Sequence, residues 1–211
     1  MNVWGFLLSF VKIGKWLSPV EHLVWDQGAA GSNPVFPTYL KCMFEKIIYG
    51  ETYGYKDFIT EDERVYLLES ARKLSNLMNI VGSKRMFYLD KISDYPHDLI
   101  KEIRDRIAIT EQLENFKELE KGKNFFAEYG KDSECRLHRD PTFETDYIHV
   151  RYNLMLSKPD RGGQTVHGDE FLDIDERVLW KCFAEHLEHG SDVVMGNKPR
   201  SIISMGFLIK K

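Results

Sequence analysis

The stretch "RLHRDP", residues 136–141, places a histidine two positions before an aspartate, just after the β-like run "NFFAEYG" at 124–130. Residues i and i+2 of a strand point to the same side, so His138 and Asp140 can share one cation. A metal needs at least one more ligand, and it must come from another part of the chain. Without that ligand, the pair is simply two polar residues at the end of a strand.

Four histidines are candidates for the third ligand: His149, His167, His186 and His189. We favour His189, which lies 49 positions after Asp140 and directly precedes the β-like stretch "GSDVV". His186, in the same "EHLEH" run, remains the alternative. We interpret His149 as a surface or core residue and His167 as a loop residue or substrate contact.

A cation follows the histidine at a fixed offset. Arg200 lies eleven positions after His189 and opens the apolar run "RSIISMGFLI", residues 200–209. A guanidinium in an apolar strand needs an anionic partner, and its geometry matches a carboxylate. The chain therefore predicts two histidines and a carboxylate around a metal, beside a carboxylate receptor. Such a ligand set is typical of non-haem Fe(II) oxygenases and is also compatible with a hydrolytic zinc centre.

The stretch from about Asn124 to Ile209 resembles the iron(II)/2-oxoglutarate-dependent dioxygenases. That family's pattern is H-x-D, a gap near fifty residues, then H and an R about ten residues later. The matching residues here are His138, Asp140, His189 and Arg200. The resemblance implies a double-stranded β-helix, the jelly-roll fold of cupin-like proteins.

The resemblance also implies the chemistry. The first three residues would hold Fe(II), and Arg200 would bind the far carboxylate of the co-substrate 2-oxoglutarate. With O2, and with the family's ascorbate dependence, the enzyme would hydroxylate a substrate and release succinate and CO2.

Two further residues are expected to bind the co-substrate. Tyr129 lies nine residues before His138, where many family members place a tyrosine that touches 2-oxoglutarate. Asn153 shares a strand face with Arg151 by alternation, and polar side chains inside a barrel need a ligand or a partner. The opposite phasing, which would place Arg151 in solvent, stays open.

Helical signals precede the β-rich half of the chain. "TEDE" at 60–63 is a capping box before apolar residues at helical spacing as far as Met78, and a second helix should follow Pro96 as far as Ile107. "RMFYLDKI" at 85–92 reads as a strand and "TEQLENFKELEKG" at 110–122 as a third helix. Further strands are predicted at 124–129, 134–139, 147–157, 164–167, 177–183, 191–194 and 200–209. We expect an α+β chain with a mainly-β core at 123–209 and helical support at 60–121.

The 211 residues suggest one domain, residues 43–211, behind a poorly defined N-terminal extension, residues 1–42. Within the extension, "DQGAAGSNPVFPT" resembles the conceptual translation of a transfer-RNA T-arm, so we expect a mis-called start and a functional chain that begins near Met43. Net charge is -4 without a basic cluster, which disfavours nucleic-acid binding.

No apolar run is long enough to span a membrane, and three widely spaced cysteines favour a reducing, cytoplasmic compartment. The partner is expected to be a small molecule or an exposed peptide side chain. A non-catalytic jelly-roll binding module is the other alternative to the enzyme, and the sequence does not indicate an oligomeric state. The acidic stretch around Asp173, Asp175 and Glu176 reads as a solvated loop with an incomplete calcium pattern.

Overall fold

The structure, a computed structural model, describes residues 44–74, 79–92, 95–119, 124–140 and 145–211. The predicted extension at 1–42 lies outside these residues, as does the predicted continuation of the first helix at 75–78. The division of the chain into an extension and a dioxygenase domain therefore stays a prediction.

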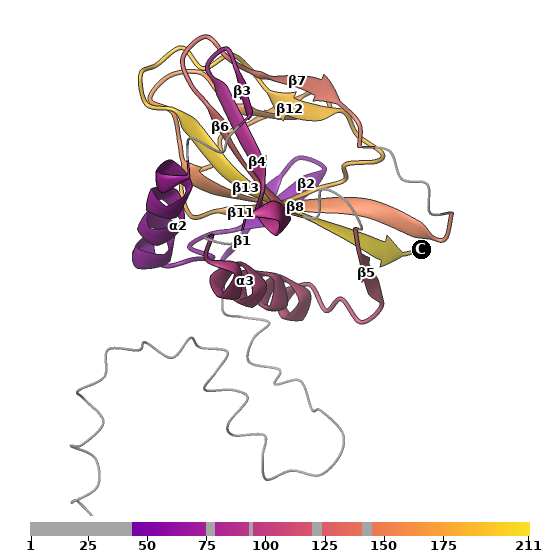
Figure 1. Cartoon of the computed structure of the whole chain (residues 1–211). Coiled ribbons are helices and arrows are strands. Elements are labelled where there is room, and N and C mark those ends of the chain that lie inside the picture. The colour runs from indigo at the N-terminus through magenta and orange to yellow at the C-terminus, as the bar shows by residue number, and fades with distance from the viewer. Residues whose placement is uncertain (1–43, 75–78, 93–94, 120–123, 141–144) are drawn as a thin grey trace, which may run out of the picture. The chain divides into compact units, whose positions relative to one another are not determined.

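Two antiparallel sheets make up most of the described chain (Figure 1). The large sheet runs in the order β1 (Lys46–Tyr49), β2 (Thr52–Tyr55), β11 (Leu179–Cys182), β8 (Tyr147–Ser157), β13 (Arg200–Lys210), β6 (Asn124–Tyr129), β4 (Lys84–Tyr88) and β3 (Asn79–Val81), with β5 (Phe116–Glu118) paired to β13. The small sheet runs in the order β10 (Glu170–Leu172), β9 (Thr165–His167), β12 (His189–Ser191) and β7 (Cys135–His138).

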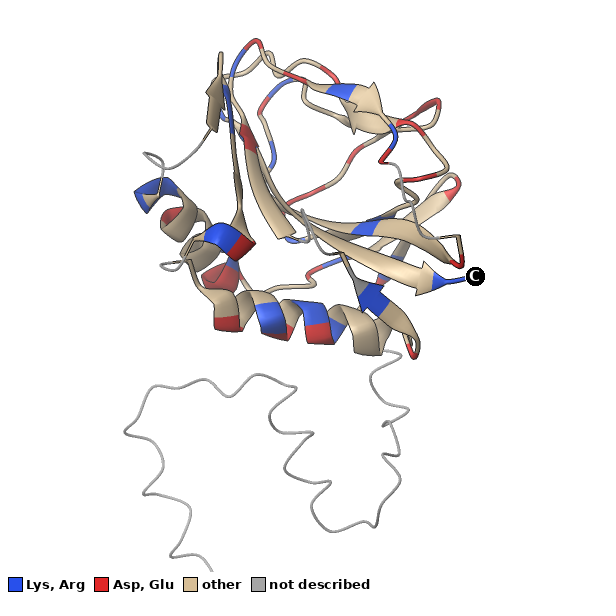
Figure 2. Ribbon diagram, turned by 45° about the vertical axis from the view of Figure 1, so that its right-hand side comes forward, with Lys and Arg blue, Asp and Glu red and all other residues tan. Residues whose placement is uncertain are grey.

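Two helices, α2 (Glu61–Lys73) and α3 (His97–Thr110), lie on one side of the large sheet, and the small sheet lies on the other (Figures 1 and 2). A short 3-10 turn, η4 (Leu89–Lys91), follows β4. The predicted capping box is confirmed, because Thr60 Oγ1 accepts from the Glu63 backbone and the Glu63 carboxylate accepts from the Thr60 backbone. Lysine and arginine alternate with aspartate and glutamate along α3 in Figure 2.

Strand alternation gives the large sheet two different faces. On the helix side, Ile203, Met205 and Phe207 of β13 join the main hydrophobic core. On the other side, the same strand presents Arg200 and Ile202, and the second apolar cluster there is smaller. One face thus holds the helices, while the other faces the small sheet and carries polar groups.

The longest strands lie where the sequence predicts them, and one predicted helix is wrong. The predicted strands at 124–129 and 147–157 coincide with β6 and β8, and that at 200–209 with all but the last residue of β13. The third helix expected at 110–122 is absent from the described residues of that range: α3 ends at Thr110, and β5 pairs with β13 instead. Tertiary contacts override helix propensity here, because Phe116 packs on Phe207 with ring centroids 5.3 Å apart.

Smaller differences concern the ends of elements. The strand expected at 85–92 is β4 and then η4, and the strand expected at 191–194 is β12, shifted toward the N-terminus. Val194 forms only an isolated bridge with Gly162. Strands β7, β9 and β11 lie within the ranges predicted for them, and β1, β2, β3 and β10 were not predicted.

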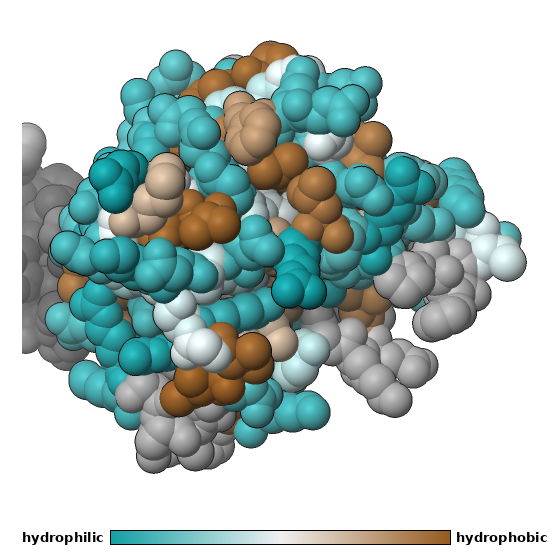
Figure 3. All heavy atoms as spheres, turned by 90° about the horizontal axis from the view of Figure 1, so that it is seen from above, coloured by the Kyte–Doolittle hydropathy of each residue, from teal (hydrophilic) through white to brown (hydrophobic). Residues whose placement is uncertain are grey.

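Figure 3 views the molecule from above, the side on which Figure 1 draws β3, β7 and β12. Apolar groups on this face are separated by hydrophilic ones. The exposed apolar side chains of the described residues come from several elements, among them Val81 of β3, Leu137 of β7 and Phe171 of β10. Scattered exposed apolar residues are normal for a folded protein. No described helix is both long and apolar enough to cross a membrane.

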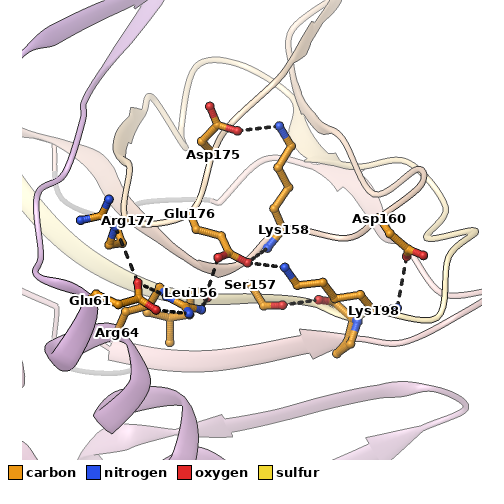
Figure 4. A network of polar contacts seen from close by, with 11 residues as sticks. Glu61, Arg64, Leu156, Ser157, Lys158, Asp160, Asp175, Glu176, Arg177 and Lys198 are labelled. Carbon is orange, nitrogen blue, oxygen red and sulfur yellow. Dashed lines mark hydrogen bonds and ion pairs between the residues drawn. The ribbon is translucent and has the colours of Figure 1, made fainter.

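A polar network connects α2 to the ends of strands in the large sheet (Figure 4). Arg64 of α2 donates to the Leu156 carbonyl at 2.6 Å and lies 3.4 Å from the Glu176 carboxylate. Lys198 binds the same carboxylate at 2.6 Å, and Lys158 binds Asp175 at 2.7 Å. The acidic stretch considered for calcium is therefore paired with cations of the chain itself.

Candidate metal centre and co-substrate pocket

Pairing of β7 with β12 brings the three predicted metal ligands together. His138, at the end of β7, lies directly opposite His189, at the start of β12, and their ring centroids are 4.4 Å apart. Asp140 follows β7, and its backbone N–H donates to the Ala184 carbonyl at 2.8 Å. One donor atom from each of the three side chains lies within 4.8 Å of the others. No other group of this kind occurs in the part of the chain that the structure describes.

The two imidazole rings are oriented in the same way. His138 Nδ1 lies 2.8 Å from the Arg136 carbonyl, and His189 Nδ1 lies 3.2 Å from the Leu187 carbonyl. A carbonyl accepts, so each Nδ1 carries the proton and each Nε2 is left as a donor to a metal. His138 Nε2 is 3.5 Å from Asp140 Oδ1, and His189 Nε2 is 4.0 Å from Asp140 Oδ2.

The surroundings shift the pKa values of His138, His189 and Asp140 in different directions. A hydrogen bond with Cys135, only partly opposed by burial, raises the pKa of His138 to about 9. Burial, reinforced by the positive charge of His138, lowers the pKa of His189 to about 4. Burial acts to raise the pKa of Asp140, but the charge of Arg151 and its hydrogen bond outweigh that effect and lower it. At neutral pH, a cation that enters the site displaces a proton from His138.

A cavity of about 680 Å³ lies between the two sheets, and the side chains of His138, Asp140 and His189 line it. Its floor is the large sheet, where strand register sets the side chains in rows. Lys84, Tyr129 and Arg200 stand side by side on β4, β6 and β13. Two rows further along, the neighbours are Tyr88, Phe125, Ser204 and Asn153.

Arg200 is a buried cation whose hydrogen-bonding capacity is not fully used. The residue is 2% exposed, and its Nη2 donates to Thr165 Oγ1 at 3.0 Å. Its Nε has no partner, and no carboxylate among the described residues forms an ion pair with it. Its guanidinium carbon lies 5.7 Å from the Tyr129 ring centroid and 5.9 Å from that of Trp180. Buried charges need a partner, so this arrangement favours an anion that enters the cavity.

Tyr129 and Asn153, the other two expected co-substrate residues, also line the cavity and are buried. The hydroxyl of Ser204, opposite Asn153, is buried without a partner. The predicted residues thus meet in one cavity, and their roles in binding stay predictions.

The remaining histidines occupy different places. His186 lies in the turn after β11, where its backbone N–H donates to the Phe183 carbonyl. It is not part of the candidate metal-ligand group, which consists of His138, Asp140 and His189. His149 is a core residue of β8, 3% exposed, with both ring nitrogens unpartnered. His167 belongs to strand β9, not to a loop, and lines the cavity, where its Nε2 accepts from the Phe183 backbone.

Several cavity residues escaped sequence reasoning. Lys84, Met86 and Tyr88 of β4 all face the cavity, and so do Thr165 and Trp180. The alternation within β4 was the available signal, but a lone short strand does not indicate which face lies inward. Arg151, left open between cavity and solvent, faces the cavity and binds Asp140 Oδ2 through Nε.

No family model and no curated protein sequence matches the chain. Solved structures do. The viral collagen prolyl hydroxylase vCPH of Paramecium bursaria Chlorella virus-1, in complex with 2-oxoglutarate, is 12% identical with a TM-score of 0.57, over 80% of this chain and 96% of that one. The chain has the fold of the 2-oxoglutarate oxygenases. The predicted jelly roll is thereby confirmed.

Two more oxygenase structures are similar. A prolyl-4-hydroxylase of Pseudomonas putida is 16% identical with a TM-score of 0.56, over 75% of this chain and 91% of that one. HygX of Streptomyces hygroscopicus, with nickel and 2-oxoglutarate bound, is 12% identical with a TM-score of 0.59, over 77% of this chain and 88% of that one. Within this oxygenase fold, the metal-ligand group lies at the small sheet and Arg200 on the large sheet.

Proposed function

We propose that the chain is an Fe(II)- and 2-oxoglutarate-dependent dioxygenase that hydroxylates an organic substrate and releases succinate and CO2. The single observation that carries the proposal is the buried Arg200, with its unpartnered Nε, in the same cavity as the His138, Asp140 and His189 group. A metal site alone suits many enzymes. A metal site that shares a cavity with a carboxylate receptor suits an enzyme whose co-substrate ends in a carboxylate.

The donor set fits ferrous iron. Two neutral imidazole nitrogens and one carboxylate oxygen would hold the ion and leave coordination positions for other ligands. Bound Fe(II) would supply the redox chemistry that couples oxidation of 2-oxoglutarate to oxidation of a C–H bond. Fe(II) and 2-oxoglutarate agree with the ligands of the similar structures, one of which holds nickel with 2-oxoglutarate.

Residues on the large sheet would hold the co-substrate. The Arg200 guanidinium would bind the far carboxylate in a region from which Tyr129, Trp180 and Ile202 exclude water. The low exposure of these side chains strengthens a charge-assisted hydrogen bond relative to the same bond in water. Thr165 orients the guanidinium through its bond to Nη2.

The prime substrate would occupy the remaining part of the cavity, against β4 and β6. Met86, Tyr88 and Phe125 line that wall, and the Tyr88 and Phe125 rings meet edge to face with centroids 6.4 Å apart. A cavity of this size takes a small molecule or a single side chain of a peptide in addition to the co-substrate. The similar structures include hydroxylases of prolyl residues, which agrees with the peptide option.

Zinc hydrolysis uses similar ligands, and metal reconstitution separates the two functions. Protein purified without metal is loaded with Fe(II) or with Zn(II), and succinate is measured after addition of 2-oxoglutarate and air. We expect slow succinate formation with Fe(II) even without a prime substrate, none with Zn(II), and none with Asp140→Ala. Equal turnover by Asp140→Ala would exclude Asp140 as a ligand, and succinate formation independent of Fe(II) would refute the proposed function.

A further inference from the structure

Arg151 is a cavity cation that the proposed function does not use and that contacts one of the three proposed metal ligands. Its side chain comes from β8, is 11% exposed, and forms an ion pair with Asp140 through Nε and Oδ2. Arg151 lies on the large sheet, and Asp140 lies in the segment that follows β7 of the small sheet, so the ion pair connects the two sides of the cavity.

The contact with Arg151 makes the two carboxylate oxygens of Asp140 unequal. Oδ2 accepts from Arg151 and lies 4.0 Å from His189 Nε2, while Oδ1 is the oxygen without the guanidinium and lies 3.5 Å from His138 Nε2. A free carboxylate can offer both oxygens equally to a cation, whereas an oxygen that already accepts from a guanidinium has given up one lone pair and part of its charge, which favours the other oxygen as the metal ligand.

We propose that Arg151 is a positioning residue that holds Asp140 as a single-oxygen ligand and so keeps the other metal positions available to the 2-oxo acid. This inference rests on the proposed function. Arg151 acts through Asp140, and its effect differs from that of Arg200, which would bind the far carboxylate.

The Arg151 side chain lies against Phe125 and beside Gly206. Its guanidinium carbon lies 5.0 Å from the centroid of the Phe125 ring. Its neighbour across the strand pair is Gly206, where an added Cβ would come within 2.1 Å of Leu119 Cδ1 and 3.4 Å of Arg151 Nη1. The Leu119 side chain therefore occupies the space beside Gly206, next to the Arg151 guanidinium.

Three variants of the full chain test the proposal. Arg151→Met removes the donor and the charge, and Arg151→Lys keeps the charge with a different donor geometry. The control is Arg85→Met on β4, whose side chain is 47% exposed and pairs with Glu128 at 3.6 Å. Each is measured for melting temperature, for Mn(II) affinity, and, with Fe(II) under anaerobic conditions, for its absorption band with 2-oxoglutarate or with pyruvate. Pyruvate has the same 2-oxo acid group but lacks the far carboxylate.

For Arg151→Met, we expect Mn(II) affinity to be unchanged or tighter, because a cation near the site is lost and a second oxygen becomes available. Affinity for both 2-oxoglutarate and pyruvate should fall by about tenfold or more, with a shifted absorption band. Arg151→Lys should recover part of the loss, and Arg85→Met should behave as the unmodified chain. An Arg200 variant should lose affinity for 2-oxoglutarate and keep its affinity for pyruvate.

Wild-type affinities and an unshifted band in Arg151→Met would overturn the positioning role, and so would a loss of Mn(II) binding. If Arg151→Met does not fold, Arg151→Lys decides: a shifted band at unchanged melting temperature supports the role, and an unshifted band refutes it. If the wild-type chain shows no absorption band with Fe(II) and 2-oxoglutarate, the proposed function itself is refuted. If the wild-type chain shows the band and Arg151→Met shows the same band and affinities, only the role of Arg151 is refuted.

Discussion

At the scale of single residues, Arg200 is the side chain on which the proposed binding of 2-oxoglutarate depends. The guanidinium is removed from water, and the described residues give it one hydroxyl acceptor and no carboxylate. Burial lowers the pKa of the Arg200 guanidinium below the usual range of arginine, and an anionic ligand would offset this desolvation. The sequence predicted this residue because a lone arginine in an apolar strand requires a partner.

Arg200→Met is expected to raise the KM for 2-oxoglutarate by at least about 30-fold, since one partner of a buried charge pair is lost. Fe(II) binding should stay as in the unmodified chain, because the metal-ligand group lies at the other sheet. Arg161→Met is the matched control, because the Arg161 side chain is exposed, does not line the cavity and donates to the Met195 carbonyl at 3.4 Å. Unchanged KM values in Arg200→Met would remove the assigned role.

The sequence does not predict which side of its strand Arg151 faces. Alternation along β8 predicts that Arg151 and Asn153 share a face, but it does not decide whether that face is the cavity or the solvent. Only the pairing of β8 between β11 and β13, with the small sheet above it, decides the matter. The ion pair with Asp140 is a contact between distant segments, and no local pattern encodes it.

At the scale of elements, the strands with a long regular alternation were predictable, and the short ones were not. β8 and β13 each span eleven residues, long enough for the pattern to be read without knowledge of their neighbours. β1 and β2 have four residues each and are joined by a tight turn at Gly50, with a φ of 50°. Four-residue runs are too short for periodicity to separate them from loops.

The end of α3 depends on contacts with the large sheet. Glu111, the residue after the helix, accepts hydrogen bonds from the hydroxyls of Tyr53, Tyr55 and Tyr152 at 2.6, 2.6 and 2.8 Å, and from Lys181 Nζ at 3.0 Å. These four donors come from three strands. They explain why the chain leaves the helix at this residue, although the following residues favour a helix.

Glu111→Gln is expected to destabilise the fold by about 3–5 kcal/mol, because the Lys181 charge then lacks its buried partner. Burial acts to raise the pKa of Glu111, but the tyrosine hydrogen bonds and Lys181 outweigh it and lower the pKa. The contribution of Glu111 to stability is thus present above its unfolded pKa and is lost as pH falls through the lower folded pKa.

Thermal unfolding of the two chains between pH 3 and pH 7 checks the Glu111 prediction. The melting temperatures should differ most at neutral pH and approach each other as the pH falls. Glu114→Gln, at an exposed position on the same segment, is the control. A Glu111→Gln chain as stable as the control at pH 7 would contradict the structural role.

At the scale of the whole molecule, the arrangement of the two sheets brings the residues of the proposed site together. The large sheet supplies Arg200, Tyr129 and Asn153, and the small sheet with its connections supplies the metal-ligand group, so the cavity between them holds both halves of the site. The sequence predicted members of both halves because the spacing of His138, Asp140, His189 and Arg200 resembles the dioxygenase pattern and because alternation places Asn153 beside Arg151 on one strand face. It could not predict the β4 residues of the wall proposed for the substrate, because β4 lies outside the predicted β-rich core.

The most direct test of this account is an anaerobic titration of the metal-free chain with Fe(II) and then with 2-oxoglutarate, followed by visible absorption. We expect one equivalent of Fe(II) to bind and a weak charge-transfer band to appear only when 2-oxoglutarate is added. Retention of zinc without such a band, or no uptake of metal, would contradict the claim that these two sheets enclose a ferrous 2-oxoglutarate site.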